Sequence, residues 1–288
     1  MRPGFQDSGH VFSRRPSRGL FGLISCGIAF LALPAAARAD GALYNLPPEI
    51  LHVVLLLPAF LLGIGLHEWA HASTAWRLGD NTAANEGRLS LNPLDHLDPM
   101  GTLFIFVAVI KGWPLIGWGR PVPVSLRNFR RPIRDHALVA AAGPMMNVLI
   151  AATACVLVAA LNTTGGSGGV AGHALRNVDR MLRLVSQVNF MLAVFNLIPI
   201  PPLDGSRILE NYLDARQTLM MRQIQPYGFM ILLVLIQTPL LEVPFGKVWV
   251  LMFALWSSPG YSLGFLLAVV AGWSAFLRTI RSQEFGGR

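Results

Sequence analysis

The chain alternates between long apolar runs and short polar connections. The apolar runs cover about residues 20–37, 50–75, 137–161, 184–203, 227–241 and 248–276. Most of these runs approach or exceed the ~20 residues that an α-helix needs to cross about 30 Å of hydrocarbon. The pattern therefore predicts an all-α polytopic membrane protein with about six hydrophobic segments.

Two parts of the chain fit this pattern less simply. Residues 102–110 form an apolar run that is too short to cross a bilayer as a helix, so we expect a re-entrant, interfacial or strand-like segment there. Residues 1–39 combine a basic start, an apolar run and a small-residue pattern that ends at Ala39. Such a segment is either a cleaved signal peptide or a first transmembrane segment. Residues 40–288 are expected to form one membrane-embedded domain.

The composition supports insertion into a lipid bilayer. The chain is 53% hydrophobic and only 13% charged, and its mean hydropathy of +0.51 is too high for an ordinary soluble protein. The formal net charge is +8, but the basic residues are scattered among loops. We therefore interpret them as a topological signal and expect no nucleic-acid partner.

The distribution of lysine and arginine predicts the orientation in the membrane. When the spans alternate from a cytoplasmic N-terminus, the basic loop 77–134 and the C-terminus lie in the cytoplasm, and the glycine-rich loop 162–172 lies outside. Arg176, Arg180 and Arg183 are exceptions, because this arrangement puts them on the outer side.

The motif His67-Glu68-Trp69-Ala70-His71 lies at the end of the second apolar run. Each helical residue turns about 100°, so histidines at i and i+4 share one face and can bind one metal ion. Two imidazoles on Zn²⁺, with a neighbouring carboxylate that takes a proton from zinc-bound water, are typical of zinc hydrolases. In a chain with 7 histidines among 288 residues, roughly 0.004 such motifs are expected by chance. We therefore predict a zinc site with Glu68 as the base.

The predicted zinc site lies at membrane depth. About 26 Å of helix separates position 50 from His67, which is nearly the hydrocarbon thickness. The orientation given above then puts the site towards the cytoplasmic side. Ionisable residues at such depth are costly and normally functional.

Catalytic zinc sites usually have three protein ligands, so a third ligand must come from elsewhere in the chain. Asp204 is favoured, because Pro199, Pro201 and Pro202 should end the preceding helix and present the carboxylate from irregular backbone. Its alternative role is to cap the next helix. The other downstream candidates are Asp80, Glu86, Asp95, His96, Asp98, Asp135, His136, His173, Glu210 and Asp214.

Taken together, these motifs resemble the site-2 protease family of intramembrane zinc metalloproteases. The resemblance rests on the motif 67–71, on Asn196 to Pro199, and on Leu203-Asp204-Gly205. The segments 87–101 and 142–147 also match patterns of the compact members of that family, and the agreement covers about residues 51–205.

The resemblance implies that His67, His71 and Asp204 bind Zn²⁺ and that Glu68 is the catalytic base. It places Asn147 and Asn196 near the active site as substrate or oxyanion contacts, with helix packing as the alternative role for both. The implied substrate is another membrane protein, cleaved in or near a transmembrane segment. The implied location is the inner or plasma membrane of a bacterium, with the active site towards the cytoplasm.

Several interpretations stay open. The same ligands could serve a membrane metal-binding or metal-transport protein without hydrolysis, or a catalytically silent relative, but neither requires Glu68. Residues 102–110 and 121–124 form either a structural loop or an edge that receives an extended substrate. The loop 92–99 has the composition of turns, so we expect its acids and His96 to bond locally or to support the site rather than to bind metal. Gly63 and Gly65 are expected to permit close helix packing.

Overall fold

The computed structural model describes residues 48–101, 119–163, 170–236 and 238–285, together with residues 103 and 107. Within these residues the regular elements are all helices and there is no strand, as the all-α prediction requires. One isolated antiparallel bridge joins Leu97 to Gly119. Residues 1–39, and the predicted segment 102–110 apart from positions 103 and 107, lie outside the described residues.

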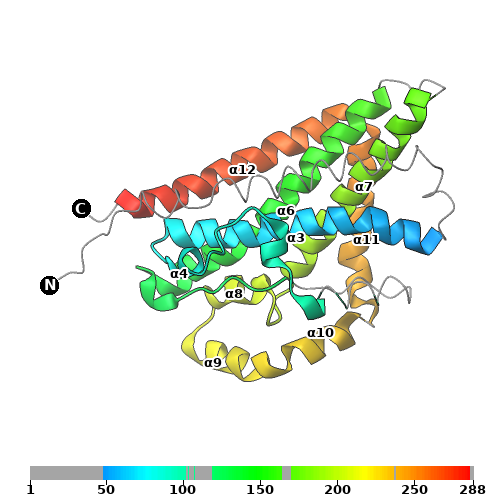
Figure 1. The fold of residues 1–288 in the computed structure, drawn as a ribbon. Coiled ribbons are helices and arrows are strands. Elements are labelled where there is room, and N and C mark those ends of the chain that lie inside the picture. The colour runs from blue at the N-terminus through cyan, green and yellow to red at the C-terminus, as the bar shows by residue number, and fades with distance from the viewer. Residues whose placement is uncertain are drawn as a thin grey trace.

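Long helices form the body of the molecule (Figure 1). They are α3 (Pro48–Arg77), α6 (Pro132–Thr163), α7 (Val170–Asn196), α11 (Glu242–Ser257) and α12 (Pro259–Phe285). The shorter helices are α4 (Thr82–Asn85), η2 (Pro93–His96), η3 (Leu126–Asn128), α8 (Asp204–Glu210), α9 (Ala215–Ile224), η4 (Gln225–Tyr227), α10 (Gly228–Ile236) and η5 (Pro239–Leu241).

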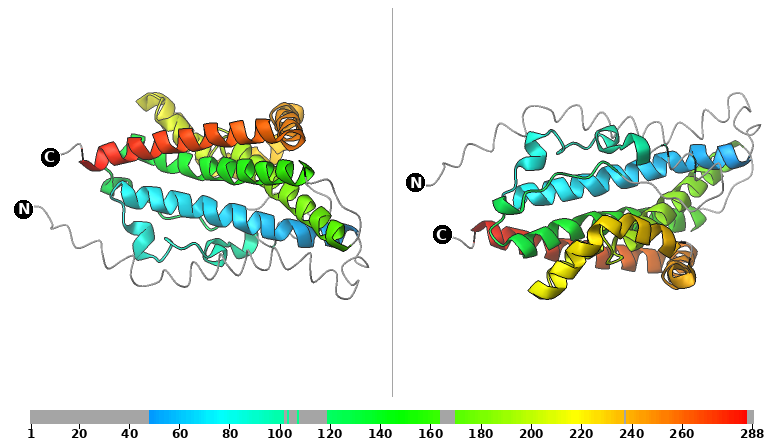
Figure 2. Two further views of the ribbon diagram at one scale, coloured as in Figure 1. Left: turned by 90° about the horizontal axis from the view of Figure 1, so that it is seen from above. Right: turned by 90° about the horizontal axis from the view of Figure 1, so that it is seen from below.

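Helix α6 is the centre of the bundle. It packs against α3, α7, α8, α11 and α12, and Figure 2 shows it between α3 and α12. Its buried positions are rich in alanine, including Ala140, Ala142, Ala151 and Ala152, all fully buried. Small residues let neighbouring helix backbones approach closely, which is how helices associate in a membrane.

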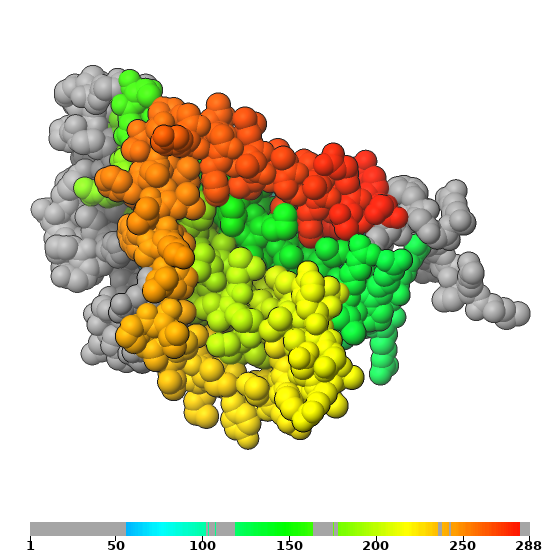
Figure 3. All heavy atoms as spheres, turned by 180° about the vertical axis from the view of Figure 1, so that it is seen from behind, coloured from blue at the N-terminus to red at the C-terminus, as the bar shows by residue number. Residues whose placement is uncertain are grey.

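Three stretches of the described chain are long and apolar enough to cross a membrane: Pro132–Thr163, Pro239–Ser257 and Pro259–Ser282. Helices α11 and α12 leave large apolar side chains exposed, among them Val250, Phe253 and Leu267. Figure 3 shows one face of the molecule on which both helices lie at the surface. An apolar surface of this kind suits lipid rather than water. The protein is therefore an integral membrane protein, while the number of six hydrophobic segments stays a prediction.

Three of the predicted apolar runs are interrupted in the structure. The run 184–203 is helical only as far as Asn196, as its prolines predicted. The run 248–276 is divided at Ser258, which is extended (φ −142°, ψ 121°) because the residue before a proline disfavours the helical conformation. In the run 227–241, α10 has only 9 residues, or about 14 Å of helix, which is too short to cross the hydrocarbon alone.

Candidate metal centre

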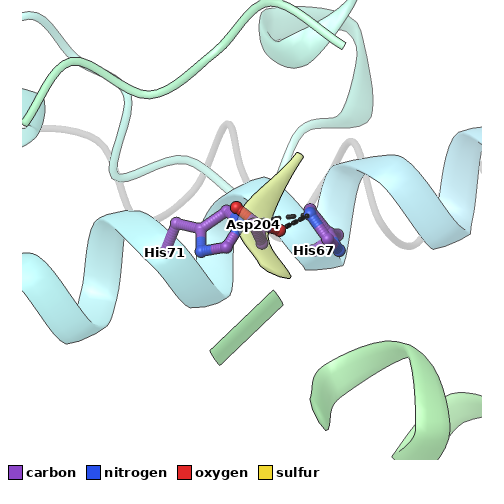
Figure 4. A group of neighbouring side chains, drawn as sticks. All are labelled: His67, His71 and Asp204. Carbon is purple, nitrogen blue, oxygen red and sulfur yellow. Dashed lines mark hydrogen bonds and ion pairs between the residues drawn. The ribbon is translucent and has the colours of Figure 1, made fainter. Parts of the chain in front are cut away.

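His67 and His71 project from one face of α3, one turn apart, as the spacing predicted. Their imidazole rings meet edge to face with centroids 4.5 Å apart, and their Nε2 atoms are 3.0 Å apart. Both residues are buried, with 7% and 6% of their surface exposed. The two rings therefore converge on one point inside the bundle (Figure 4).

Asp204 reaches the same point from α8. Helix α7 ends at Asn196, turns and bends occupy residues 197–203, and Asp204 is the first residue of α8. Because prolines lack a backbone donor, this segment cannot continue the helix and instead redirects the chain. Asp204 is 6% exposed, and its Oδ2 lies 3.2 Å from Nε2 of His67 and 3.2 Å from Nε2 of His71.

The outer nitrogen of each imidazole is held by an oxygen on α6. His67 Nδ1 donates to Asn147 Oδ1 at 2.7 Å, and His71 Nδ1 donates to the carbonyl of Val139 at 2.7 Å. These oxygens only accept hydrogen bonds, so each Nδ1 carries the hydrogen and each neutral ring keeps a lone pair on Nε2. Zinc-binding histidines are normally oriented by a bond of this kind to their other nitrogen.

The arrangement fits Zn²⁺. Two lone pairs 3.0 Å apart repel each other, and the Oδ2 of Asp204 is a buried oxygen without a hydrogen-bond partner. A cation between the three atoms satisfies all of them. Tetrahedral zinc with bonds of about 2.0–2.1 Å places its ligand atoms about 3.3 Å apart, close to the separations of 3.0 and 3.2 Å seen here. Among the described residues, these three form the one group with the spacing of a metal site.

Gly143 of α6 forms the floor of the site. A Cβ at this position would lie 2.5 Å from His67 Cε1 and 2.5 Å from His71 Nε2, closer than such atoms approach in proteins. The α6 backbone therefore packs directly against both rings, and only glycine permits this contact.

Glu68 borders a cavity of about 420 Å³ that opens onto the three candidate ligands. Asn196 and Arg207 are the other polar residues of its wall, and Nη1 of Arg207 lies 3.9 Å from Asp204 Oδ1. The rest of the wall is apolar and comes from Ile64, Gly119, Pro121, Val122, Val124, Val139, Leu192, Phe195, Pro202, Leu203, Phe229, Leu232 and Leu233. A half-buried carboxylate thus lines the same largely apolar cavity as the three candidate ligands.

Asn147 and Asn196 lie in different surroundings, although the family resemblance implied the same role for both. Asn196 lines the cavity, and its Nδ2 donates to the Leu192 carbonyl. Asn147 does not line the cavity, is fully buried, and uses both ends of its amide, on His67 and on Asn189. Sequence reasoning missed the contribution of Asn189, which is one of three amide residues, with Gln187 and Asn196, in the apolar run 184–203.

Val139 and Arg207 also escaped sequence reasoning, which named Gly143 only as part of the family-like segment 142–147 and gave it no contact with the histidines. Val139 acts through its backbone carbonyl, so it has no distinctive signal in the sequence. Arg207 follows Asp204 by three residues, which places it on the same face of α8.

Other candidate ligands bond locally instead. Asp95 accepts from Ser90 Oγ at 2.6 Å, and His96 Nε2 donates to the Ser90 carbonyl at 2.7 Å, so the expected turn chemistry of this loop is observed. Asp135 accepts from the Arg131 amide. Asp214 forms a capping box with Gln217 at the start of α9.

Asp80 is also engaged away from the candidate metal centre. It accepts bonds from the Thr82 amide and hydroxyl, the Ser125 amide and the Asn128 side chain. Burial opposes ionisation of this carboxyl, but these hydrogen bonds outweigh it and lower the pKa of Asp80 below its ordinary value.

The comparisons with known proteins agree on one family. Residues 164–238, which include Asp204, match the family model described as Peptidase family M50. The "Putative zinc metalloprotease YwhC" of Bacillus subtilis is 39% identical over 185 residues, which are 64% of this chain and 81% of that protein. Proteins named "Putative zinc metalloprotease Rip2" from Mycolicibacterium smegmatis and Mycobacterium tuberculosis are 31% and 30% identical, each over 74% of this chain and 81% of the relative.

No solved structure matches the chain significantly. The assignment therefore rests on the sequence relatives and the family model, whose match includes the position of Asp204. Since the matched relatives are covered over four fifths of their length at 30% identity or more, the chain belongs to peptidase family M50, the site-2 protease family that its motifs resemble.

Proposed function

We propose that the protein is an intramembrane endopeptidase that cleaves other membrane proteins in or near their transmembrane segments. The chain is a zinc metalloprotease of family M50, and the proposal adds the substrate class and the residues that act. The observation that carries it is the buried convergence of His67, His71 and Asp204 beside Glu68, inside a bundle of apolar helices.

In the proposed mechanism, His67, His71 and Asp204 would hold the metal. When bound, the zinc ion supplies a Lewis acid that polarises the scissile carbonyl and activates a water molecule. Glu68 takes a proton from the attacking water at its carboxylate and returns that proton to the departing amine. The largely apolar walls around Glu68 lower the local polarity, which strengthens the electrostatic interactions within the site.

The segment 119–124 is the proposed binding edge for the substrate. It borders the cavity through Gly119, Pro121, Val122 and Val124, and a Cβ at Gly119 would lie 3.3 Å from Glu68 Oε1. This segment is neither helix nor strand beyond the bridge of Gly119 to Leu97. A helical peptide bond is shielded by its own hydrogen bonds, so a substrate helix must unwind, and an extended chain can then lie along such an edge.

The proposed location is the inner or plasma membrane of a bacterium, with the active site towards the cytoplasm. The exposed apolar faces of α11 and α12 support a lipid environment. The basic loop 77–134 and the basic C-terminus support the orientation, because such residues favour the cytoplasmic side.

The experiment that tests this function compares wild type with Glu68→Gln in liposomes. The substrate is a single-span membrane protein identified by crosslinking to the Glu68→Gln variant in native membranes. We expect wild type to cleave it, and Glu68→Gln to keep its zinc but lose activity by at least ~10²-fold, the scale of acid–base catalysis. Glu86→Gln is the matched control, because Glu86 is an exposed carboxylate beyond α4 and should leave cleavage unchanged.

Two results would contradict the proposal. Undiminished cleavage by Glu68→Gln would remove Glu68 from the role of base. Zinc flux into the liposomes with no cleavage by wild type would support metal transport through the same ligands.

A further inference from the structure

A chain of buried amides connects His67 to the backbone of α7. His67 Nδ1 lies 2.7 Å from Asn147 Oδ1, Asn147 Nδ2 lies 3.1 Å from Asn189 Oδ1, and Asn189 Nδ2 lies 2.9 Å from the carbonyl of Val185. This series of hydrogen bonds crosses from α3 through α6 to α7, and we call it the amide relay. It consists of the side chains of His67, Asn147 and Asn189 and the Val185 carbonyl.

The direction of the amide relay is set at its α7 end. The Val185 carbonyl can only accept, so Asn189 must turn its NH₂ group towards it and its oxygen towards Asn147. Asn147 must then donate to Asn189 and present its own oxygen to His67. His67 is left with one choice, a hydrogen on Nδ1 and a lone pair on Nε2, which is the tautomer that binds a metal between Nε2 and Asp204.

Burial makes these hydrogen-bond directions obligatory. Asn147 and Asn189 are both 0% exposed, so the loss of a partner leaves a buried polar group unsatisfied. Gly63, one turn before His67 on α3, makes room for the relay, because a Cβ there would lie 2.9 Å from Asn189 Oδ1. The close packing expected at Gly63 is therefore confirmed, and it serves the relay directly.

We propose that Asn189 is a positioning residue that fixes the metal-binding tautomer of His67 through Asn147. Asn189 is not one of the candidate ligands and does not line the cavity. This inference rests on the proposed role of His67 as a zinc ligand. It also gives Asn147 a structural task in place of the substrate or oxyanion contact expected from the family resemblance.

Zinc affinity of the purified full-length protein, measured by competition with a chelator, tests the inference without any substrate. In Asn189→Leu, Asn147 loses the partner that orients it and can turn its NH₂ group towards His67, which favours the tautomer with a hydrogen on Nε2. We expect zinc affinity to fall about 10–100-fold, the usual effect of losing an outer partner of a metal ligand. If Asn189→Leu does not fold, Asn189→Ser takes its place with the same expected loss, because its hydroxyl is too short to reach Asn147.

Ser186→Ala is the matched control on the same helix. Ser186 is also 0% exposed and accepts from Trp256 Nε1 at 3.1 Å, so the variant loses a buried bond between helices but leaves the relay intact. We expect it to bind zinc like wild type. Equal zinc affinity in Asn189→Leu and wild type, or an equal loss in Ser186→Ala, would overturn the proposal.

A double variant distinguishes the loss of the Asn147 orientation from a general disruption of the packing. Asn147→Asp offers His67 only oxygen atoms, so the acceptor no longer depends on Asn189. In this background, Asn189→Leu should change zinc affinity by less than about threefold, whereas independent effects would add in full and contradict the relay. Because zinc binding is the readout, the relay can hold even if no membrane substrate is cleaved, and cleavage can occur even if the relay fails.

Discussion

Replacing Gly143 by alanine tests the contact between α6 and the candidate metal ligands. A Cβ at position 143 would lie 2.5 Å from His67 Cε1, 2.5 Å from His71 Nε2 and 2.6 Å from His67 Nε2. Non-bonded atoms prefer separations of about 3.5 Å, so the rings must move by up to about 1 Å. Metal–ligand distances tolerate only about 0.2 Å, and we therefore expect zinc affinity to fall by at least ~10²-fold.

The fold should survive this substitution, because alanine favours a helix by about 1 kcal/mol over glycine and α6 extends over 32 residues. The assay is chelator competition with purified protein, alongside thermal unfolding of the zinc-free protein. Gly272→Ala in α12 is the control, since a Cβ there meets nothing within 4 Å and should leave zinc affinity unchanged. Wild-type zinc affinity in Gly143→Ala would show that the imidazoles do not lie against α6 and would refute the geometry of the site.

Three further predictions concern the third metal ligand, the hydrogen bonds of Asp80 and the orientation of the protein in the membrane. Asp204→Ala should lose most of its zinc affinity, while Asp95→Ala should keep it, because Asp95 bonds only within its own loop; the reverse result would assign the wrong carboxylate. Asp80→Asn should lower stability by about 2–3 kcal/mol, because it sets an NH₂ group against hydrogen-bond donors. Because the pKa of Asp80 is lower in the folded than in the unfolded state, its ionised carboxylate stabilises the fold at pH values above the unfolded pKa. The difference in thermal unfolding between wild type and Asp80→Asn should therefore hold above about pH 5 and shrink as acid protonates Asp80 in wild type. A difference that does not change with pH would contradict this prediction. In a Cys26→Ser, Cys155→Ser background, Ser167→Cys should react with an impermeant maleimide from outside and Ser282→Cys only after permeabilisation, and the opposite pattern would invert the topology.

Those parts of the site that depend on local spacing could be predicted from the sequence. The four-residue interval between His67 and His71 determines that they share a face of α3, and the prolines before Asp204 determine where α7 ends. The local bonding of the loop around Asp95 follows equally from its turn-forming residues.

Other features depend on which helices become neighbours, and a single sequence does not state this. The pairing of His71 with the Val139 carbonyl needs α3 and α6 in one particular register, and a carbonyl has no residue signature. The role of Asn147 was open for the same reason, since an amide can face a substrate or a ligand. Pro259 indicates that a helix ends at Ser258, but the apolar pattern continues on both sides and predicted one uninterrupted run.

X-ray absorption at the zinc edge of the purified protein tests the central claim, that His67, His71 and Asp204 hold the metal. The account predicts stoichiometric zinc with nitrogen and oxygen ligands at about 2.0–2.1 Å and the outer-shell signals of two imidazoles. The oxygen contribution should weaken in Asp204→Ala. A sulfur ligand at about 2.3 Å, or a number of imidazoles other than two, would contradict the account.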